Sequence, residues 1–124
     1  MLKKKGKFCI GNIKDFKSTR GYILGSFMKE KGFPQLQSSK VEIKWETGYR
    51  ALERNKHYHK KMLEVVLVIK GWVKTKVDDK EYSITQGQFY IIYPYTVVED
   101  LKAGKNTGLI TIKAPSLSKD KFQL

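Results

Sequence analysis

Cysteine, proline, arginine and long apolar runs are all scarce in this 124-residue chain. The only cysteine, Cys9, cannot form a disulfide within the chain, and no group of cysteines and histidines has the spacing of a structural zinc site. No apolar stretch approaches the ~20 residues of a membrane-spanning helix, and the segment after the basic residues 1–7 is too short and polar for a signal peptide. We therefore expect a cytoplasmic protein with no membrane association.

Acidic residues are scarce as well, because 12 Asp and Glu face 25 Lys and Arg, a formal net charge of +13. Only three of the basic residues are arginine, the side chain that reads phosphate and guanine edges through paired hydrogen bonds. No nucleic-acid-binding signature is visible, so nucleic acid is disfavoured as a partner. Lysines alternate along predicted strands, as in Lys74-Thr75-Lys76, and we expect them on outer faces. The charge thus indicates solubility and attraction for a small anionic or sugar-like ligand.

Short β-rich runs separated by turn residues dominate the chain from Gly21 onward, and helical periodicity is nearly absent. The run from Glu64 to Ile69 is almost wholly apolar, as in a strand covered on both sides. We predict strands over 22–28, 40–45, 64–69, 72–77, 81–84, 89–92 and 109–113, a hairpin turn at 78–80, and a short helix only within 12–20.

This pattern predicts an all-β protein, an antiparallel sandwich or small barrel with a single core that needs no disulfide. The barrel domain is expected over residues 21–115. Residues 1–20 form an N-terminal segment that is partly mobile or adds a strand or short helix, and residues 116–124 form a C-terminal tail.

Both histidines of the chain lie in one tripeptide, His57-Tyr58-His59. Residues two apart in a strand project from the same face, so paired imidazoles at this spacing have a metal-binding geometry. Glu64 follows at the head of the apolar run, where a carboxylate is costly to desolvate unless a positive charge faces it. The three residues therefore predict a site for a divalent ion with open positions for water or substrate. The alternative is ordinary hydrogen bonding and pairing with the neighbouring lysines.

The order of these residues resembles the first motif of the cupin superfamily, His57-x-His59-x4-Glu64-x6-Gly71. Part of the second cupin motif is present as Gly87 and Tyr93-Pro94, and the resemblance, which is to a small single-domain bacterial cupin, covers residues 41–113. It implies a single-domain jelly-roll β-barrel and a homodimer. It also implies a divalent metal ion at His57, His59 and Glu64, with no distinction among manganese, iron, zinc and nickel.

Two positions depart from the cupin pattern. The glycine that usually begins the first motif falls at Ala51, and the histidine that ends the second motif is replaced. Either Val98 or Glu99 takes its place, depending on which part of the motif is aligned. Adjacent residues of a regular strand face opposite sides, so an inward Val98 leaves three protein ligands, whereas a bulge that turns Glu99 inward adds a fourth metal ligand. Asp100 shares the side of Val98 and is a further, poorer candidate.

The resemblance implies a small-molecule site inside the barrel, in carbohydrate or small-metabolite metabolism. As an enzyme, the protein would be a metal-dependent isomerase, lyase or dioxygenase, with Glu99 and Tyr90 as candidate catalytic residues that move a proton. One alternative is a non-catalytic ligand-binding or sensing module with weak or no metal, which the missing histidine favours. Another is a non-heme iron dioxygenase, because two histidines and one carboxylate leave iron positions open for dioxygen.

Overall fold

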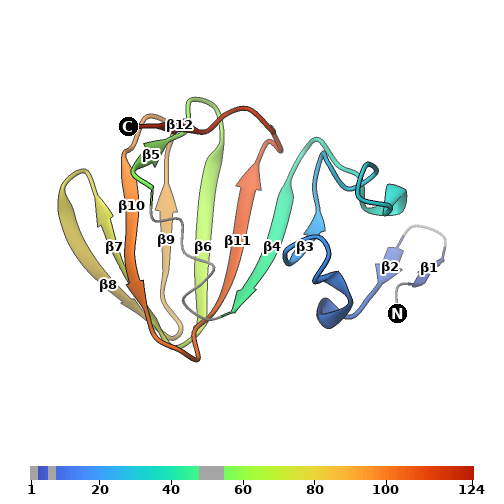
Figure 1. Ribbon diagram of the computed structural model, residues 1–124, viewed down its shortest axis with the longest axis horizontal. Helices are drawn as coiled ribbons and strands as arrows, with labels where there is room; N and C mark the ends of the chain where they lie inside the picture. The colour runs from blue at the N-terminus through green and yellow to red at the C-terminus, as the bar shows by residue number, and fades with distance from the viewer. Residues whose placement is uncertain (1–2, 6–7, 48–54) are drawn as a thin grey trace.

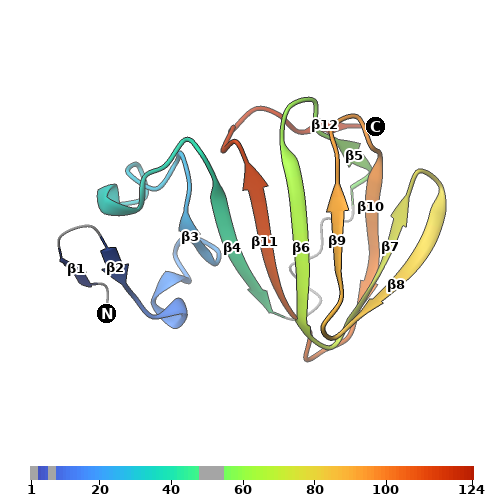
Figure 2. The ribbon, with the colours of Figure 1, turned by 180° about the vertical axis from the view of Figure 1, so that it is seen from behind.

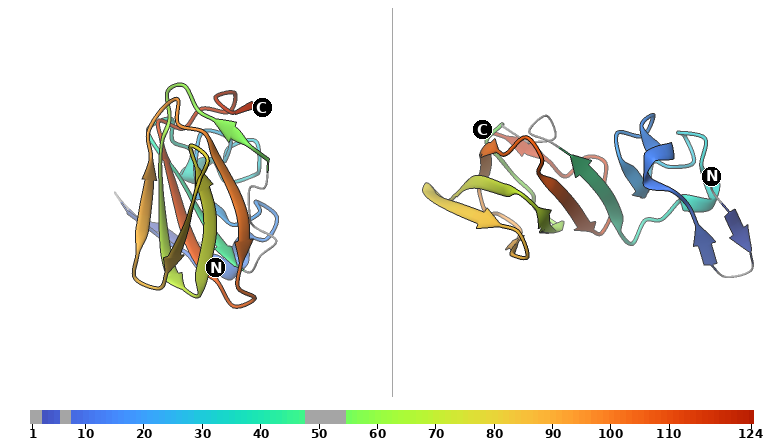
Figure 3. Two further views of the ribbon diagram at one scale, coloured as in Figure 1. Left: turned by 90° about the vertical axis from the view of Figure 1, so that its left-hand side faces the viewer. Right: turned by 90° about the horizontal axis from the view of Figure 1, so that it is seen from below.

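Two five-stranded antiparallel sheets make up the main body of the computed structural model, which describes residues 3–5, 8–47 and 55–124 (Figure 1). Sheet I has the strand order β3-β4-β11-β6-β9, and sheet II has the order β12-β5-β10-β7-β8. Seen from one end, the two sheets face each other (Figure 3). The predicted all-β class is therefore confirmed. Among the described residues, no helix is long and apolar enough to cross a membrane.

The elements follow the predicted runs closely in the second half of the chain and less closely in the first. The strands are β1 (Lys3–Lys5), β2 (Phe8–Ile10), β3 (Tyr22–Leu24), β4 (Glu42–Thr47), β5 (His57–Tyr58), β6 (Leu63–Lys70), β7 (Trp72–Val77), β8 (Lys80–Thr85), β9 (Phe89–Ile92), β10 (Val98–Ala103), β11 (Gly108–Ala114) and β12 (Phe122–Gln123). Two 3-10 helices are η1 (Ile13–Phe16) and η2 (Pro34–Leu36).

The tight connections around β7 have clear local causes. Asp78 and Asp79 both have positive φ, 46° and 70°, which suits the two-residue hairpin that joins β7 to β8. Gly71, with φ of 78°, joins β6 to β7, and a Cβ at this position would lie 2.7 Å from the Cα of Thr107. A larger residue therefore cannot replace Gly71 without moving the neighbouring chain.

The strand predicted over 22–28 is shorter in the structure, because β3 ends at Leu24. The chain turns at Gly25, and the amide of Ser26 donates to Ser116 Oγ at 2.9 Å instead of to a neighbouring strand. Met28, fully buried, then packs in a second apolar cluster beside β3, formed by Phe16, Met28 and Leu36. The short helix expected within 12–20 is η1, and Asn12 caps it by accepting from the Lys14 amide at 3.1 Å.

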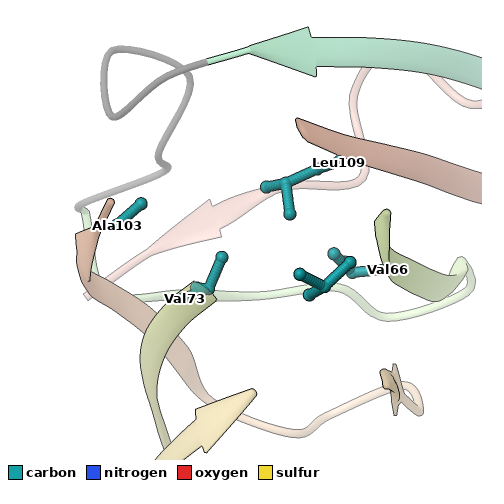
Figure 4. Close-up of a cluster of buried hydrophobic side chains, with 5 residues drawn as sticks. Val66, Val73, Ala103 and Leu109 are labelled. Carbon is teal, nitrogen blue, oxygen red and sulfur yellow. The ribbon is translucent and has the colours of Figure 1, made fainter. Parts of the chain in front are cut away.

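The main core occupies one end of the space between the sheets. Its buried side chains come from β6, β7, β10 and β11 and point toward one another (Figure 4). They are Val66, Val68, Val73, Ala103 and Leu109. Burial of each valine or leucine contributes roughly 1.5–3 kcal/mol. The opposite end of the same strands carries titratable side chains instead, so the core does not extend through the whole molecule.

Sheet I has an unusual distribution of side chains between its two faces. Strands β4, β11, β6 and β9 lie side by side (Figure 2), and directly paired residues point to the same face. The outer face carries two apolar rows, Trp45, Ile110, Leu67 and Phe89, and Ile43, Ile112, Val65 and Ile91. None of these eight side chains is buried, and Phe89 is 60% exposed. The prediction that both sides of β6 are covered is wrong for the part of the chain that the structure describes, which covers only the inner side.

Two lysines also occupy positions that the sequence pattern did not predict. Lys44 on β4 and Lys113 on β11 project from the inner face of sheet I and line a cavity between the sheets. The expectation that the lysines cover outer faces therefore fails for this pair, because the apolar residues that alternate with them point outward.

Candidate metal centre

A cavity of about 440 Å³ lies between the sheets directly beside the main core, whose Val66 and Leu109 form part of its lining. Both sheets line it, together with residues from the 19–31 region and from the segment that follows β11. All three sequence-predicted metal ligands, His57, His59 and Glu64, face into it, and so does Tyr90. A cavity of this volume accommodates a small metabolite.

The two histidines are buried and each is oriented by a backbone carbonyl. His57 Nδ1 lies 2.7 Å from the Asn55 carbonyl, and His59 Nδ1 lies 2.7 Å from the Asp120 carbonyl. A carbonyl oxygen only accepts hydrogen bonds, so each Nδ1 carries a proton and donates it. In the neutral ring this leaves Nε2 with a free lone pair, which is the arrangement found in metal-binding histidines.

Glu64 completes the group from the head of β6. One ligand atom from each of His57, His59 and Glu64 lies within 4.8 Å of the others, a spacing compatible with joint ligation of one ion. His59 Nε2 and Glu64 Oε1 are 3.5 Å apart, and both are buried without a hydrogen-bond partner. Two facing acceptors with no donor between them are costly in a protein interior unless a proton or a cation lies there. The residues present therefore fit a divalent metal ion.

The ionisation states of this group also suit a metal ion. Burial lowers the pKa of His57, which keeps its ring neutral at physiological pH. Burial by itself raises the pKa of Glu64, but a proton on His59 Nε2, which would donate to Glu64, and the charge of Lys113 outweigh that effect, and the pKa is lowered. A neutral imidazole and an ionised carboxylate are the forms that bind metal.

Asp120 holds the chain that follows His59. Its carboxylate accepts from the backbone amides of Lys60, Lys61 and Met62, at 3.1, 2.9 and 2.7 Å. Burial by itself raises the pKa of Asp120, but these three amide hydrogen bonds outweigh it and the pKa is lowered. The segment 116–124, expected as a tail, thus supplies the carbonyl that orients His59 and the carboxylate that binds the amides of residues 60–62. It also forms strand β12 against β5.

No protein-family model matches the sequence, and no curated protein sequence matches it. Three solved structures illustrate its structural similarities. A Streptomyces nucleoside dehydratase, Pac13, whose structures include complexes with uridine, has 10% identity and a TM-score of 0.60, over 74% of this chain and 73% of that one. A cupin protein from Bacteroides fragilis has 16% identity and a TM-score of 0.56, over 71% and 76%. A Klebsiella pneumoniae protein with a double-stranded β-helix domain has 15% identity and a TM-score of 0.58, over 69% of this chain and 76% of that one.

The chain has a cupin fold. At these identities the similarity concerns the fold, and the chemistry of the site has to be argued from the residues of this chain. The jelly-roll architecture implied by the sequence motif is thereby confirmed. Ala51, where the usual glycine of the first cupin motif is replaced, lies outside the described residues.

The register of β10 decides which residue of this chain lies at the position that the resemblance assigns to the second-motif histidine. Val98 is buried and pairs with both His57 and Val77, while Glu99 pairs with Lys76 on the opposite side of the strand. A bulge does occur in β10, but it lies between Asp100 and Lys102, after Glu99. Asp100 lines the cavity and Glu99 does not. The three-residue group thus has no contribution from Glu99.

Tyr90 and Asp100 form a pair at the edge of the cavity. The Tyr90 hydroxyl donates to Asp100 Oδ1 at 3.3 Å, with Tyr90 from sheet I and Asp100 from sheet II. Burial, and then the negative charge of Asp100, raise the pKa of Tyr90 well above its usual range. The phenol therefore remains protonated at neutral pH and is available as a hydrogen-bond donor.

Sequence reasoning missed the charged residues on the inner face of sheet I. Glu42, Lys44 and Glu46 alternate on β4, and Lys113 lies on β11 beside them. Glu42 accepts from Ser116 Oγ at 3.0 Å, and Lys44 Nζ lies 2.7 Å from Glu46 Oε1. The available signal was the shared parity of these three β4 residues, but parity does not say which face is inside.

Proposed function

We propose that this cupin is a metal-dependent enzyme that acts on a small polar metabolite, with a divalent ion held by His57, His59 and Glu64. The observation that supports the proposal most directly is the pair of buried, unpartnered acceptors on His59 and Glu64. When bound, such an ion would act as a Lewis acid on an oxygen of the ligand. Two nitrogen donors and one carboxylate favour manganese or iron over softer metals.

Two residues near the proposed metal, Tyr90 and Asp100, would supply and orient a proton. Tyr90 holds a proton on its hydroxyl and presents it at the cavity, with Asp100 as the group that orients it. The role first considered for Glu99 is thus better served by Asp100, which faces the cavity. The expected ligand is small and anionic or sugar-like, and the shared fold with a uridine-bound nucleoside dehydratase supports a ligand of this size.

A non-catalytic sensing module is the second candidate, because apolar Val98 lies where the second-motif histidine of a cupin usually lies. A non-heme iron dioxygenase is a third, since the three-ligand set leaves iron positions open. The bound metal distinguishes the sensing module from the enzymes. Iron together with ligand-dependent oxygen consumption would select the dioxygenase.

Elemental analysis of protein purified without added metal tests the proposal. We expect about one manganese or iron per chain in the wild type and less than a tenth of that in His57→Ala, because two ligands bind far more weakly than three. Tyr58→Phe is the matched control, because Tyr58 lies between the two histidines but stacks against Tyr95 and Phe122, away from the ligands. It should retain the metal. Absence of metal from the wild type, even after incubation with each ion, would leave only the sensing module.

We also propose that two copies of the chain pair through the outer face of sheet I. The two apolar rows of that face contain no charged residue, in a chain with net charge +13. A second copy offers the same uncharged face, so the surface is self-complementary and its burial keeps the lysines of the two copies apart. Face-to-face packing of two such sheets is a common arrangement.

A charge placed at the centre of this face should prevent the pairing. We expect Ile112→Lys to reduce the mass measured by light scattering from about 28.8 kDa, twice the 14.4 kDa of one chain, to 14.4 kDa. A lysine at this position faces apolar partners in both copies, and its desolvation has no compensating contact. Ser83→Lys, at an exposed position on the outer side of sheet II opposite Lys74, is the control and should remain dimeric. A monomeric wild type would contradict the proposal.

A further inference from the structure

Lys113 lies next to the proposed metal centre, and the proposed function does not yet assign it a role. It projects from β11 into the cavity, directly opposite Glu64 on β6 and directly opposite Glu42 on β4. Side chains that are directly opposite in antiparallel strands have Cβ atoms about 4.5–5.5 Å apart. The inner face of sheet I therefore carries one row of alternating charge, with the ammonium group between a proposed metal ligand and a second carboxylate.

Among the described residues, no carboxylate lies within ion-pair distance of Lys113. The other inward lysine of the sheet, Lys44, is already paired with Glu46. Burial by itself lowers the pKa of Lys113, but the surrounding negative charge, first that of Glu64, outweighs it and the pKa is raised. The lysine is thus a cation that lines the cavity and has no ion-pair partner among residues 3–5, 8–47 and 55–124.

Binding of a divalent ion would change the balance of charge around Lys113. The row of Glu42, Lys113 and Glu64 has a formal charge of −1 + 1 − 1 = −1. A divalent ion at Glu64 converts this to −1 + 2 = +1. Glu64, the carboxylate that balances the charge of Lys113, is then also neutralised by the metal ion. Lys113 can therefore bind one negative charge supplied by a ligand. The lining of the cavity also includes Arg20, Lys31 and Lys121, whose positive charges favour entry of an anion.

We propose that Lys113 is a specificity-determining residue that binds a singly charged oxyanion of the ligand, a carboxylate in its ordinary form, once the metal is in place. The proposal rests on the proposed function, because it needs a metal ion at Glu64. It names a substrate class, small metabolites with a carboxylate next to a metal-binding oxygen. It also makes binding of the anion and binding of the metal mutually reinforcing.

Calorimetric titration with glycolate, a small hydroxycarboxylate, tests this assignment. In the presence of saturating Mn²⁺ we expect Lys113→Met to bind glycolate about 10- to 100-fold more weakly than the wild type, because one charge-assisted contact is lost. Its affinity for Mn²⁺ alone should be equal to or higher than that of the wild type, because a positive charge beside Glu64 has been removed. Glycolamide, which lacks the charge, should bind both proteins with similar weak affinity. The metal-free wild type should bind glycolate at least about tenfold more weakly than the loaded protein.

Lys44→Met is the matched control, because it removes the same charge from the same wall, one position along the sheet. Its glycolate affinity should change by less than about threefold, since Lys44 is engaged with Glu46. Equal glycolate affinity in wild type and Lys113→Met, both loaded with Mn²⁺, would overturn the role of Lys113 and leave the metal site intact. Failure of the wild type to bind Mn²⁺ or iron would instead overturn the proposed function and this inference with it. Should Lys113→Met not fold, Lys113→Gln and the metal dependence of the wild type give the same decision.

Discussion

Saturation with a divalent metal ion is expected to raise the midpoint of thermal unfolding of this protein by about 10 °C. A ligand at 100 times its Kd that binds only the folded state adds about 2.7 kcal/mol, and each kcal/mol shifts the midpoint of a domain of this size by about 3–5 °C. The physical reason is that His59 Nε2 and Glu64 Oε1 face each other without a donor in the folded protein. A metal ion supplies the missing positive charge at that point.

The shift, rather than the absolute midpoint, is the quantity to compare between variants. In His59→Ala we expect a metal-induced shift of less than about 2 °C, because two ligands remain and affinity falls steeply. Glu64→Gln, which keeps the shape of the side chain without its charge, should lose most of the shift as well. Tyr58→Phe should retain it in full. A chelator should reverse the effect in the wild type. An equal shift in wild type and His59→Ala would show that the ion acts elsewhere.

Replacement of Asp120 by alanine is expected to lower the free energy of unfolding by about 3 kcal/mol or more. The Asp120 carboxylate accepts three backbone amide hydrogen bonds, a buried one from Met62 and partly buried ones from Lys60 and Lys61. A buried donor that loses its partner costs about 1–3 kcal/mol, and the two partly buried hydrogen bonds add about 1 kcal/mol each. The Asp120 backbone also positions His59, so the same variant should bind metal less tightly than the wild type. Urea unfolding and a metal titration measure the two effects separately.

Two further variants show whether the loss comes from the hydrogen bonds of Asp120, from its charge, or from any substitution in this segment. Asp120→Asn keeps one acceptor oxygen but presents an amide nitrogen to the remaining donors. It should therefore lower the free energy of unfolding by no more than Asp120→Ala does. Lys119→Ala, at the exposed neighbouring position, should change stability by less than about 0.5 kcal/mol. A loss below 1 kcal/mol in Asp120→Ala would contradict the structural role.

The lowered pKa of Asp120 gives this contribution a pH dependence of known sign. A carboxyl group whose pKa is lower in the folded than in the unfolded state stabilises the protein fully above its unfolded value, about 3.9. The contribution should therefore be constant at neutral pH and should decrease as the pH falls below about 4. The difference in stability between wild type and Asp120→Ala should narrow over the same range.

Much of the local organisation could be predicted from the chain alone. Period-two alternation and turn residues located β7 and β9 at their observed ends, and the paired aspartates marked the hairpin between β7 and β8. The spacing of His57, His59 and Glu64 named the three residues that the structure brings together. These features depend on neighbours within a few positions, which is why sequence patterns carry them.

Other parts of the site depend on contacts between distant residues. Asp120 and His59 are 61 positions apart, and the short segment around Asp120 has no periodicity that would distinguish it from a tail. Likewise, the choice between Val98 and Glu99 depended on whether a bulge preceded or followed Glu99, and the structure places it after that residue. The bulge belongs to the pairing of β10 with β7, so no local signal revealed its position.

The sequence by itself determined which residues of sheet I share a face, because side chains alternate along every strand. It could not determine which face lies inside. Ile43 and Trp45 share one side of β4, and Lys44 shares the other with Glu42, whichever way the strand is turned. Only the packing of sheet II against the charged side made that side the wall of a cavity and left the apolar side exposed. Alternation is a property of the backbone, whereas inside and outside are set by where the second sheet, which carries His57, comes to lie.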